Sequence, residues 1–235
     1  MIGRLTLALC VGLFALPVDA STIATRGAAS AQGFGFNKSG VPLTPGTTWN
    51  PADKNGNLTL SPDNLTVTQT AGNTNNAGVR AIAGKTTGKF YFELNSSGTA
   101  GPFNMGFGIG NSSATIITSP FWNSFNGVGY RANGGVLLNG NALANVSAWD
   151  VGTSTEQLAI DLSAKLLWVR KVGDPNWNGN PAADPATGVG GIALTGLLAG
   201  PYFPIYNSSL VGDTTTVNFG PTYVGTVPAG FLQWK

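Results

Sequence analysis

Histidine is absent from the 235-residue sequence, and the single cysteine, Cys10, lies in an apolar N-terminal segment. The rest of the chain therefore has no Ser-His-Asp triad, no cysteine nucleophile and no histidine base. It also lacks the two residue types from which zinc sites are usually built. We expect no metal site. We also expect no cofactor, because the glycine-rich run 106–110 (GFGIG) is not the GxGxxG loop that cradles a dinucleotide.

Charged side chains are scarce as well. Asp, Glu, Lys and Arg make up 9% of the residues, against roughly 25% in an ordinary globular protein, and the net charge is +2. Nucleic-acid binding needs clustered Lys and Arg, so we expect no nucleic-acid partner. The 34 glycines and the 42% of hydrophobic residues favour a folded, β-rich extracellular domain over a disordered chain.

The first twenty residues have the pattern of a secretory signal peptide. Arg4 precedes a mostly apolar run over residues 5–18, and a small-residue site predicts cleavage after Ala20. The run is shorter than the roughly 20 residues that a membrane-spanning helix needs, so we expect no membrane span after cleavage; an uncleaved anchor is the alternative. The sequence thus predicts a secreted or extracellular protein, and a periplasmic destination stays open.

Residues 21–47 are rich in Ser, Ala, Gly, Thr and Pro, and we predict a linker or N-terminal arm there. In the remaining domain, residues 48–235, apolar residues alternate with polar residues or glycine, as at Met105, Phe107 and Ile109. This period of two is typical of half-buried antiparallel strands. Turn signals recur between the runs and helical periodicity is missing, which together predict an all-β class and an antiparallel β-sandwich.

Two segments depart from the pattern of short strands and turns. Residues 111–126 hold three aromatic residues among Ser and Asn, and residues 173–191 form a long loop of the kind that is often functional. Within the strand pattern, Gly106, Gly108 and Gly110 leave one face smooth. Either another part of the chain packs closely on that face or a ligand approaches it.

Six motifs, in order along residues 49–234, resemble those of the SPRY domain family. They are KFYFEL (89–94), GFGIG (106–110), GY (129–130), LAIDL followed by KLLWVR (158–170), YFPI (202–205) and VNFG (217–220). The resemblance implies a concanavalin-like jelly roll that binds protein segments, in most members, through loops at one edge and without catalysis. The export signal fits secreted or phage-associated bacterial members. The chain departs from the family at 173–191, where a tight hairpin is usual.

Glycoside hydrolysis needs only two carboxyl groups, so the acidic residues of the chain keep this activity open. Glu93 lies in an aromatic strand, while Glu156 and Asp161 are five residues apart and therefore on opposite faces of another strand. An ExDxE cluster is absent. We interpret Glu93 as a structural carboxylate, bound by backbone groups or Arg. We interpret Asp53, at the start of DKNGN, as part of a turn, because the calcium-loop pattern breaks after it.

A binding surface on this chain is expected to be neutral, polar and aromatic. The strongest candidate is the tryptophan of the loop 173–191 with its flanking asparagines, although this ring could instead fold back and cap the edge of the sandwich. A second tryptophan, in 111–126, has a core position as its alternative. The candidate ligand contacts are Trp177, Asn176, Asn178, Trp122, Tyr130 and Arg131.

Three functions remain after these exclusions. The first is a secreted, non-catalytic recognition module that binds a protein segment or a glycan through its edge loops. The second is a structural subunit of a surface or phage-like appendage, in which the arm 21–47 and the edge loops mediate assembly. The third is an unusual glycan hydrolase. The sequence leaves the oligomeric state open.

Overall fold

The computed structural model describes residues 47–72, 76–97, 105–149, 152 and 154–235. These residues belong to one compact unit, residues 44–235. The predicted signal peptide and all of the predicted arm except Thr47 lie outside the described residues. In the part of the chain that is described, no helix has the length and hydrophobicity to cross a membrane.

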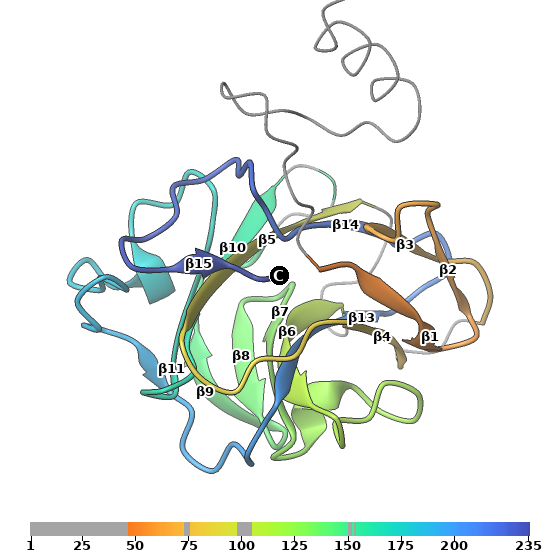
Figure 1. Ribbon diagram of the computed structural model, residues 1–235, viewed down its shortest axis with the longest axis horizontal. Coiled ribbons are helices and arrows are strands. Elements are labelled where there is room, and N and C mark those ends of the chain that lie inside the picture. Colours follow the sequence, from red (N-terminus) through yellow and green to blue (C-terminus); the bar gives the residue numbers. More distant parts are fainter. Residues whose placement is uncertain (1–46, 73–75, 98–104, 150–151, 153) are drawn as a thin grey trace, which may run out of the picture. The chain divides into compact units, whose positions relative to one another are not determined.

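Two antiparallel sheets pack face to face (Figure 1). One has seven strands, in the order β1 (Trp49–Lys54), β4 (Ala77–Ala81), β13 (Tyr202–Ser208), β6 (Gly106–Asn111), β7 (Gly127–Arg131), β8 (Gly135–Leu138) and β9 (Asn141–Asn145). The other has eight, in the order β12 (Ile192–Ala193), β11 (Leu166–Lys171), β10 (Thr155–Asp161), β5 (Lys89–Ser97), β14 (Thr214–Asn218), β3 (Thr66–Gln69) and β2 (Leu58–Leu60), with β15 (Leu232–Gln233) parallel to β5. The only helical elements in the described residues are two short 3-10 turns, η1 (Phe121–Asn123) and η2 (Trp177–Gly179).

The predicted alternation determines which residues are buried in the core. Met105, Phe107 and Ile109 are fully buried between the sheets, as are Leu158 and Ile160 from the opposite sheet. Aromatic rings fill the centre, and those of Phe92 and Phe107 meet edge to face at 6.0 Å across the sandwich. The all-β sandwich expected from the period of two is therefore confirmed.

The smooth glycine face of β6 is covered by the chain itself. A Cβ at Gly110 would lie 2.7 Å from the Ala114 Cβ, and one at Gly106 would lie 2.8 Å from the Trp122 ring. Residues 112–126 thus pack against the outer face of the seven-stranded sheet, where side chains on β6 would hold them off. Of the two alternatives for these glycines, close packing is the one that the structure has.

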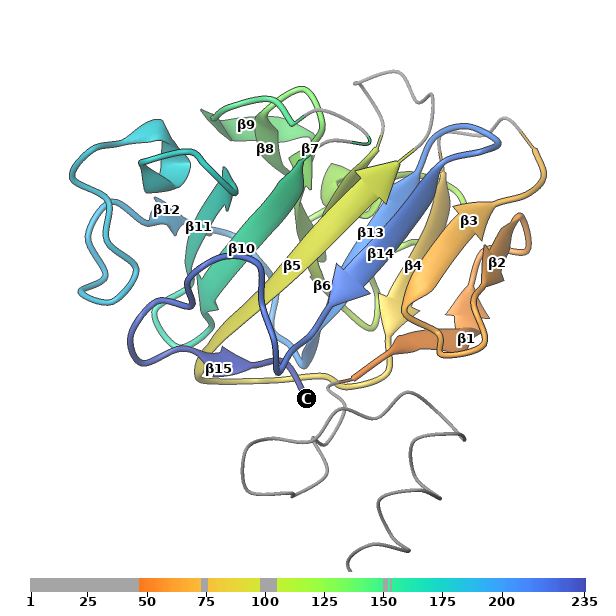
Figure 2. The same cartoon turned by 90° about the horizontal axis from the view of Figure 1, so that it is seen from above.

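The C-terminal segment, residues 220–231, covers part of the outer face of the eight-stranded sheet, and beyond it β15 pairs with β5 and Trp234 enters the main core. Figure 2 shows the segment running across β5 and β10 toward the side of the sheet that ends in β11 and β12. Beneath it lies a small apolar cluster outside the main core: Tyr91, Ala159, Trp168, Trp177 and Phe231. The sheet is therefore buried on both faces at this end, which gives outward-facing aromatic residues of β5 and β11 something to pack against.

Candidate functional site

Trp177 caps the edge of the sandwich. Its side chain is 7% exposed and belongs to the cluster beneath the C-terminal segment. The Arg170 guanidinium lies 4.2 Å above the ring centre, in the geometry of a cation–π contact. Burial lowers the pKa of Arg170 below its usual value. Of the two predictions for this ring, the structure agrees with the one in which Trp177 folds back and caps the edge of the sandwich. The expectation that the ring faces solvent is corrected accordingly.

The asparagines beside Trp177 differ in role. Asn178 adopts a left-handed backbone conformation (φ 53°). Its side-chain oxygen accepts a hydrogen bond from Val169 N at 2.8 Å, and its amide donates to the carbonyls of Leu167 (3.1 Å) and Gly190 (2.9 Å). Asn178 thus pairs with the outer edge of β11 in place of another strand, which fixes the loop 173–191. Asn176 is half-buried at the start of η2 and makes no side-chain cap.

The other predicted contacts are also interior. Trp122 is 2% exposed and lies against the glycines of β6 and β7, and Tyr130 is fully buried with its hydroxyl donating to the Ser147 carbonyl at 2.6 Å. Their expected place in an exposed binding surface is corrected accordingly. Arg131 ends β7 half-buried, and burial lowers the pKa of its guanidinium. The structure does not bring these six residues together into one surface.

The buried Glu93 carboxylate has a structural role, as interpreted from the sequence. It accepts hydrogen bonds from the Tyr91 hydroxyl (2.6 Å), Val224 N (2.8 Å), Gly225 N (2.7 Å) and the Asn218 side chain (3.2 Å). Burial, reinforced by the neighbouring Glu93, raises the pKa of Tyr91, so its hydroxyl stays protonated and continues to donate. Glu93 therefore holds the C-terminal segment on β5.

Two further acids that the sequence singled out, Asp161 and Asp53, also have structural contacts. Asp161 accepts a hydrogen bond from Ala164 N at 2.9 Å across the β10–β11 turn. Asp53, the residue that begins the calcium-like pattern, pairs with Arg80 at 2.8 Å. In residues 47–235 as far as they are described, no three Asp, Glu, His or Cys side chains gather closely enough to hold a metal ion.

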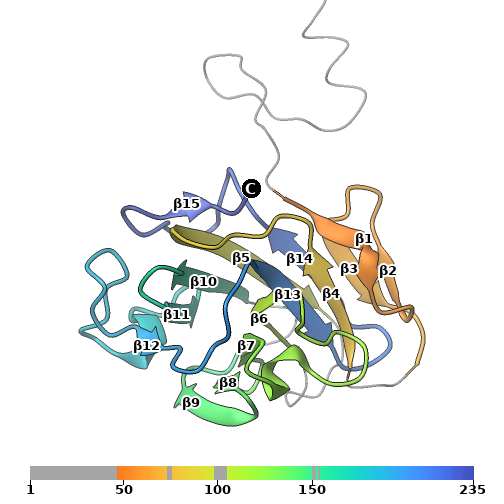
Figure 3. The ribbon, with the colours of Figure 1, turned by 60° about the horizontal axis from the view of Figure 1, so that its bottom comes forward.

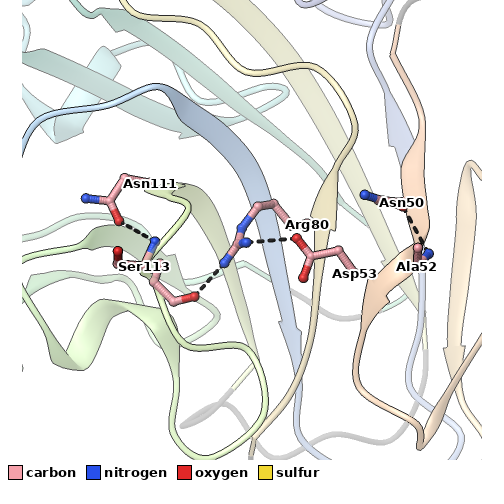
Figure 4. Close-up of polar contacts among 7 residues, drawn as sticks. Asn50, Ala52, Asp53, Arg80, Asn111 and Ser113 are labelled. Atoms are coloured by element: carbon pink, nitrogen blue, oxygen red, sulfur yellow. Dashed lines mark hydrogen bonds and ion pairs between the residues drawn. The ribbon is translucent and has the colours of Figure 1, made fainter.

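Arg80 also positions the segment that covers the glycine face. Its guanidinium pairs with Asp53 of β1 (Figure 4) and also donates to the Ala114 carbonyl. Asn111, at the end of β6, accepts a hydrogen bond from Ser113 N and donates to both Asn126 and the Ala199 carbonyl, each at 3.1 Å. These contacts fix residues 111–126 at both ends and tie them to the segment 194–200.

One aromatic ring of residues 111–126, that of Phe125, faces solvent. Phe125 is 44% exposed and Leu198 is 52% exposed, and Leu198 N donates to the Phe125 carbonyl at 2.9 Å. The phenyl ring lies directly on Gly196, where a Cβ would be 3.0 Å away. Asn139, in the β8–β9 turn, donates from its backbone to the adjacent Ser124 carbonyl. We call the surface of Phe125, Asn139 and Leu198 the Phe125 rim.

The three residues of the Phe125 rim are uncharged, and beside Leu198 the Lys165 ammonium donates to the Leu197 carbonyl at 2.8 Å. The rim has the neutral, polar and aromatic character expected of a binding surface, but the residues that form it are not the six predicted from the sequence. Sequence reasoning singled out the segment 111–126 and then chose Trp122 within it. Leu198 carried no comparable signal, because it comes close to Phe125 only through the fold.

A second uncharged surface is a pocket of about 340 Å³ beside β14. It is lined by Thr47, Leu65, Thr216, Val217, Asn218, Phe219, Gly220 and Thr222. Neighbouring threonines pair across the strands, with Thr66 and Thr216 hydroxyls 2.8 Å apart and those of Thr68 and Thr214 2.9 Å apart. A hydroxyl both donates and accepts, so this surface suits an uncharged ligand rich in hydroxyl groups.

No family model matches the sequence, and no curated protein matches it either. Solved structures with a similar fold do exist. The SPRY domain of human HERC1 is 13% identical, with a TM-score of 0.57 over 72% of this chain and 96% of that chain. The PSpry domain of TRIM65 is 16% identical, with a TM-score of 0.52 over 73% of this chain and 91% of that chain.

Stonustoxin is a further similar structure, at 18% identity and a TM-score of 0.52; the match covers 73% of this chain but 27% of that chain. All three similarities include most of the described domain. At these identities they establish the architecture and not a shared ligand. The chain therefore has the concanavalin-like β-sandwich fold of SPRY domains.

Proposed function

We propose that this chain is an exported, non-catalytic recognition module that binds an extended protein segment at the Phe125 rim. The observation that carries the proposal is the pairing of an exposed ring, 44% accessible, with an exposed leucine on loops that hydrogen bonds hold in place. Side chains that are already held in place lose little conformational freedom on binding, which lowers the cost of association. The SPRY fold supports this class of function by analogy.

The arrangement of the acids also favours binding over hydrolysis. Glycosidases need two carboxyl groups facing one another across a substrate. Here the Glu93 carboxylate is fully buried and accepts four hydrogen bonds, while Asp161 caps a turn. A carboxylate held in this way has no room for a sugar ring or an attacking water.

A glycan is the second candidate ligand, on account of the threonine-lined pocket beside β14. Paired threonine hydroxyls match the donors and acceptors of sugar hydroxyls without any charge. The pocket lacks an exposed aromatic ring on which a sugar could stack, and for this reason we place the protein segment first.

Replacing Phe125 and Leu198 by alanine is expected to weaken peptide binding at least tenfold, because a buried aromatic anchor is worth roughly 2 kcal/mol or more at an interface. The probe is a peptide selected by phage display on the mature chain, and its affinity is measured by calorimetry. Since both side chains are already half exposed, the melting temperature should change by less than about 3 °C.

The matched control is Leu232→Ala, which truncates an apolar side chain that is 64% exposed on β15. Unchanged affinity for the control and a tenfold loss in the double variant support the Phe125 rim. Equal affinities in all three proteins contradict it. Binding that appears only on a glycan array, and disappears in Thr216→Ala, moves the site to the threonine-lined pocket.

Export is the other element of the proposal, and it rests on the pattern of residues 1–20. When the chain is expressed in a host with a secretion pathway, these residues should be cleaved off, and the mature protein should begin at Ser21. Intact mass and N-terminal sequencing of the exported protein measure this directly. A protein recovered from the membrane fraction with Met1 still present speaks for an uncleaved anchor.

A further inference from the structure

The outer face of the eight-stranded sheet carries two rows of polar side chains. In β3 and β14 the buried Val67 and Val217 alternate with threonines that point outward. Strand pairing places one residue from each of four adjacent strands in line, and every member of a row is exposed or half-buried and uncharged. The first row is Thr59, Thr68, Thr214 and Ser97, and the second is Thr66, Thr216, Asn95 and Thr155. We call these eight residues the threonine face.

The C-terminal segment stops short of the threonine face. Figure 2 and Figure 3 show this segment toward the β10 and β11 side of the sheet, with β3 and β2 at the opposite side. The segment contacts β5 at Tyr91 and Glu93, whereas the two rows meet β5 at Asn95 and Ser97. This part of the sheet is therefore open to a ligand.

Hydroxyl groups of neighbouring strands pair within the rows. Those of Thr66 and Thr216 are 2.8 Å apart, and those of Thr68 and Thr214 are 2.9 Å apart. A hydroxyl can donate once and accept twice, so each pair keeps one donor and three acceptor sites for a ligand. The same contacts hold the side chains in place, which lowers the entropy cost of binding. The threonine face is thus an ordered array of donors and acceptors without charge.

The threonine-lined pocket beside β14 continues the second row. Thr216 belongs to both, and Asn218, which also lines the pocket, follows it on the same face of β14. Leu65 and Phe219 add apolar surface to the lining. A sugar ring carries hydroxyl groups at its rim and C–H groups on its faces, so a lining of both kinds suits it. The volume of about 340 Å³ lies at the lower end of the range of small-ligand sites.

The spacing and twist of the strands indicate the shape of the partner. Adjacent strands lie about 4.8 Å apart, so a row offers a polar group roughly at every sugar ring of an extended chain that crosses the strands. Adjacent strands also rotate by roughly 20–25°, which adds up to about 60–75° over the four strands of a row. A single polysaccharide chain can follow this twist, whereas the flat face of a crystalline solid touches only part of it.

We propose that the threonine face binds a single chain of a neutral polysaccharide, which lies across the strands along the two rows and places a sugar ring in the adjoining pocket. The proposal rests on the recognition function proposed above, for its second candidate ligand, but not on the Phe125 rim. Neutral hydrogen bonds are individually modest, and the face has no aromatic ring on which a sugar could stack. The affinity should therefore accumulate with the length of the chain.

Affinity electrophoresis of the mature chain tests the proposal, with a soluble mixed-linkage β-glucan, a xylan and a galactomannan as the probes. At least one of the three should retard the wild type. Thr68→Val combined with Thr216→Val removes one hydroxyl from each row and keeps the β-branched shape, so it should weaken binding at least tenfold. The matched control replaces the same two residues by serine, which keeps both hydroxyls, and should bind within about threefold of the wild type.

Two further measurements locate the site. In calorimetry, oligosaccharides cut from the retarding polysaccharide should bind more tightly as they lengthen from two sugars to about four, the number of strands in a row. Melting temperatures of the valine and serine variants should stay within about 3 °C of the wild type, because the substituted side chains lie on an open face.

The threonine face and the Phe125 rim can fail independently. The valine variant should bind the display-selected peptide like the wild type, and the Phe125 and Leu198 double variant should bind the polysaccharide like the wild type. Four results overturn the proposal: no retardation by any of the three polysaccharides, undiminished binding by the valine variant, an equal loss in the serine and valine variants, or binding to microcrystalline cellulose alone.

Discussion

Replacing Glu93 by alanine is expected to lower the melting temperature by about 10 °C. Each buried donor left without its acceptor costs roughly 1–3 kcal/mol, and each kcal/mol corresponds to about 2–4 °C in a domain of this size. Val224 N, Gly225 N and the Tyr91 hydroxyl would all lose their acceptor together. The C-terminal segment should then detach from β5 well below the global transition.

Two measurements separate these effects. Thermal unfolding followed by circular dichroism gives the change in melting temperature, and limited proteolysis reports cleavage within residues 220–231. Glu93→Gln keeps the shape of the side chain but turns an amide N–H₂ group toward backbone donors. Its melting temperature should therefore lie between those of the wild type and the alanine variant. Asp184→Ala, at an exposed turn, is the control and should cost less than about 1 kcal/mol. A Glu93→Ala protein that melts within about 2 °C of the wild type contradicts the role given to this carboxylate.

The strands of the sandwich were predictable because a period of two records which residues face the core. Phe107 on β6 and Leu158 on β10 follow this rule, since each alternates with small or polar neighbours and both are fully buried. The glycines of β6 had two possible explanations, and the fold chose between them by laying Trp122 on Gly106 and Gly129. Periodicity identifies the inner face of a sheet but not what covers the outer one.

The covering of the outer faces is what the sequence left undetermined. Trp177 stands among asparagine and glycine, which by composition favours an exposed ring. Its burial depends on Phe231 and the C-terminal segment, more than fifty positions later, and on Arg170 from β11. In the same way, the Phe125 rim joins residues from three separate loops and turns. Such surfaces arise from long-range contacts that no local pattern encodes.

Trp177→Ala is the substitution that distinguishes a structural cap from a ligand contact. Removing a buried aromatic side chain costs roughly 3–5 kcal/mol, so the midpoint of urea unfolding should fall markedly. Arg170 would lose its cation–π partner, and Trp168 and Phe231 would border a cavity. Trp177→Phe retains an aromatic ring and should recover much of the loss.

Binding measured well below the melting temperature completes the argument. The affinity of the display-selected peptide for Trp177→Ala should match that of the wild type, because the ring is 7% exposed and does not belong to the Phe125 rim. The opposite pattern, with stability retained and affinity lost, would return Trp177 to the binding surface first inferred from its asparagine neighbours. Stability and affinity therefore respond in opposite ways to Trp177→Ala and to the Phe125 and Leu198 double variant, and the two proteins measured together separate the scaffold from the site.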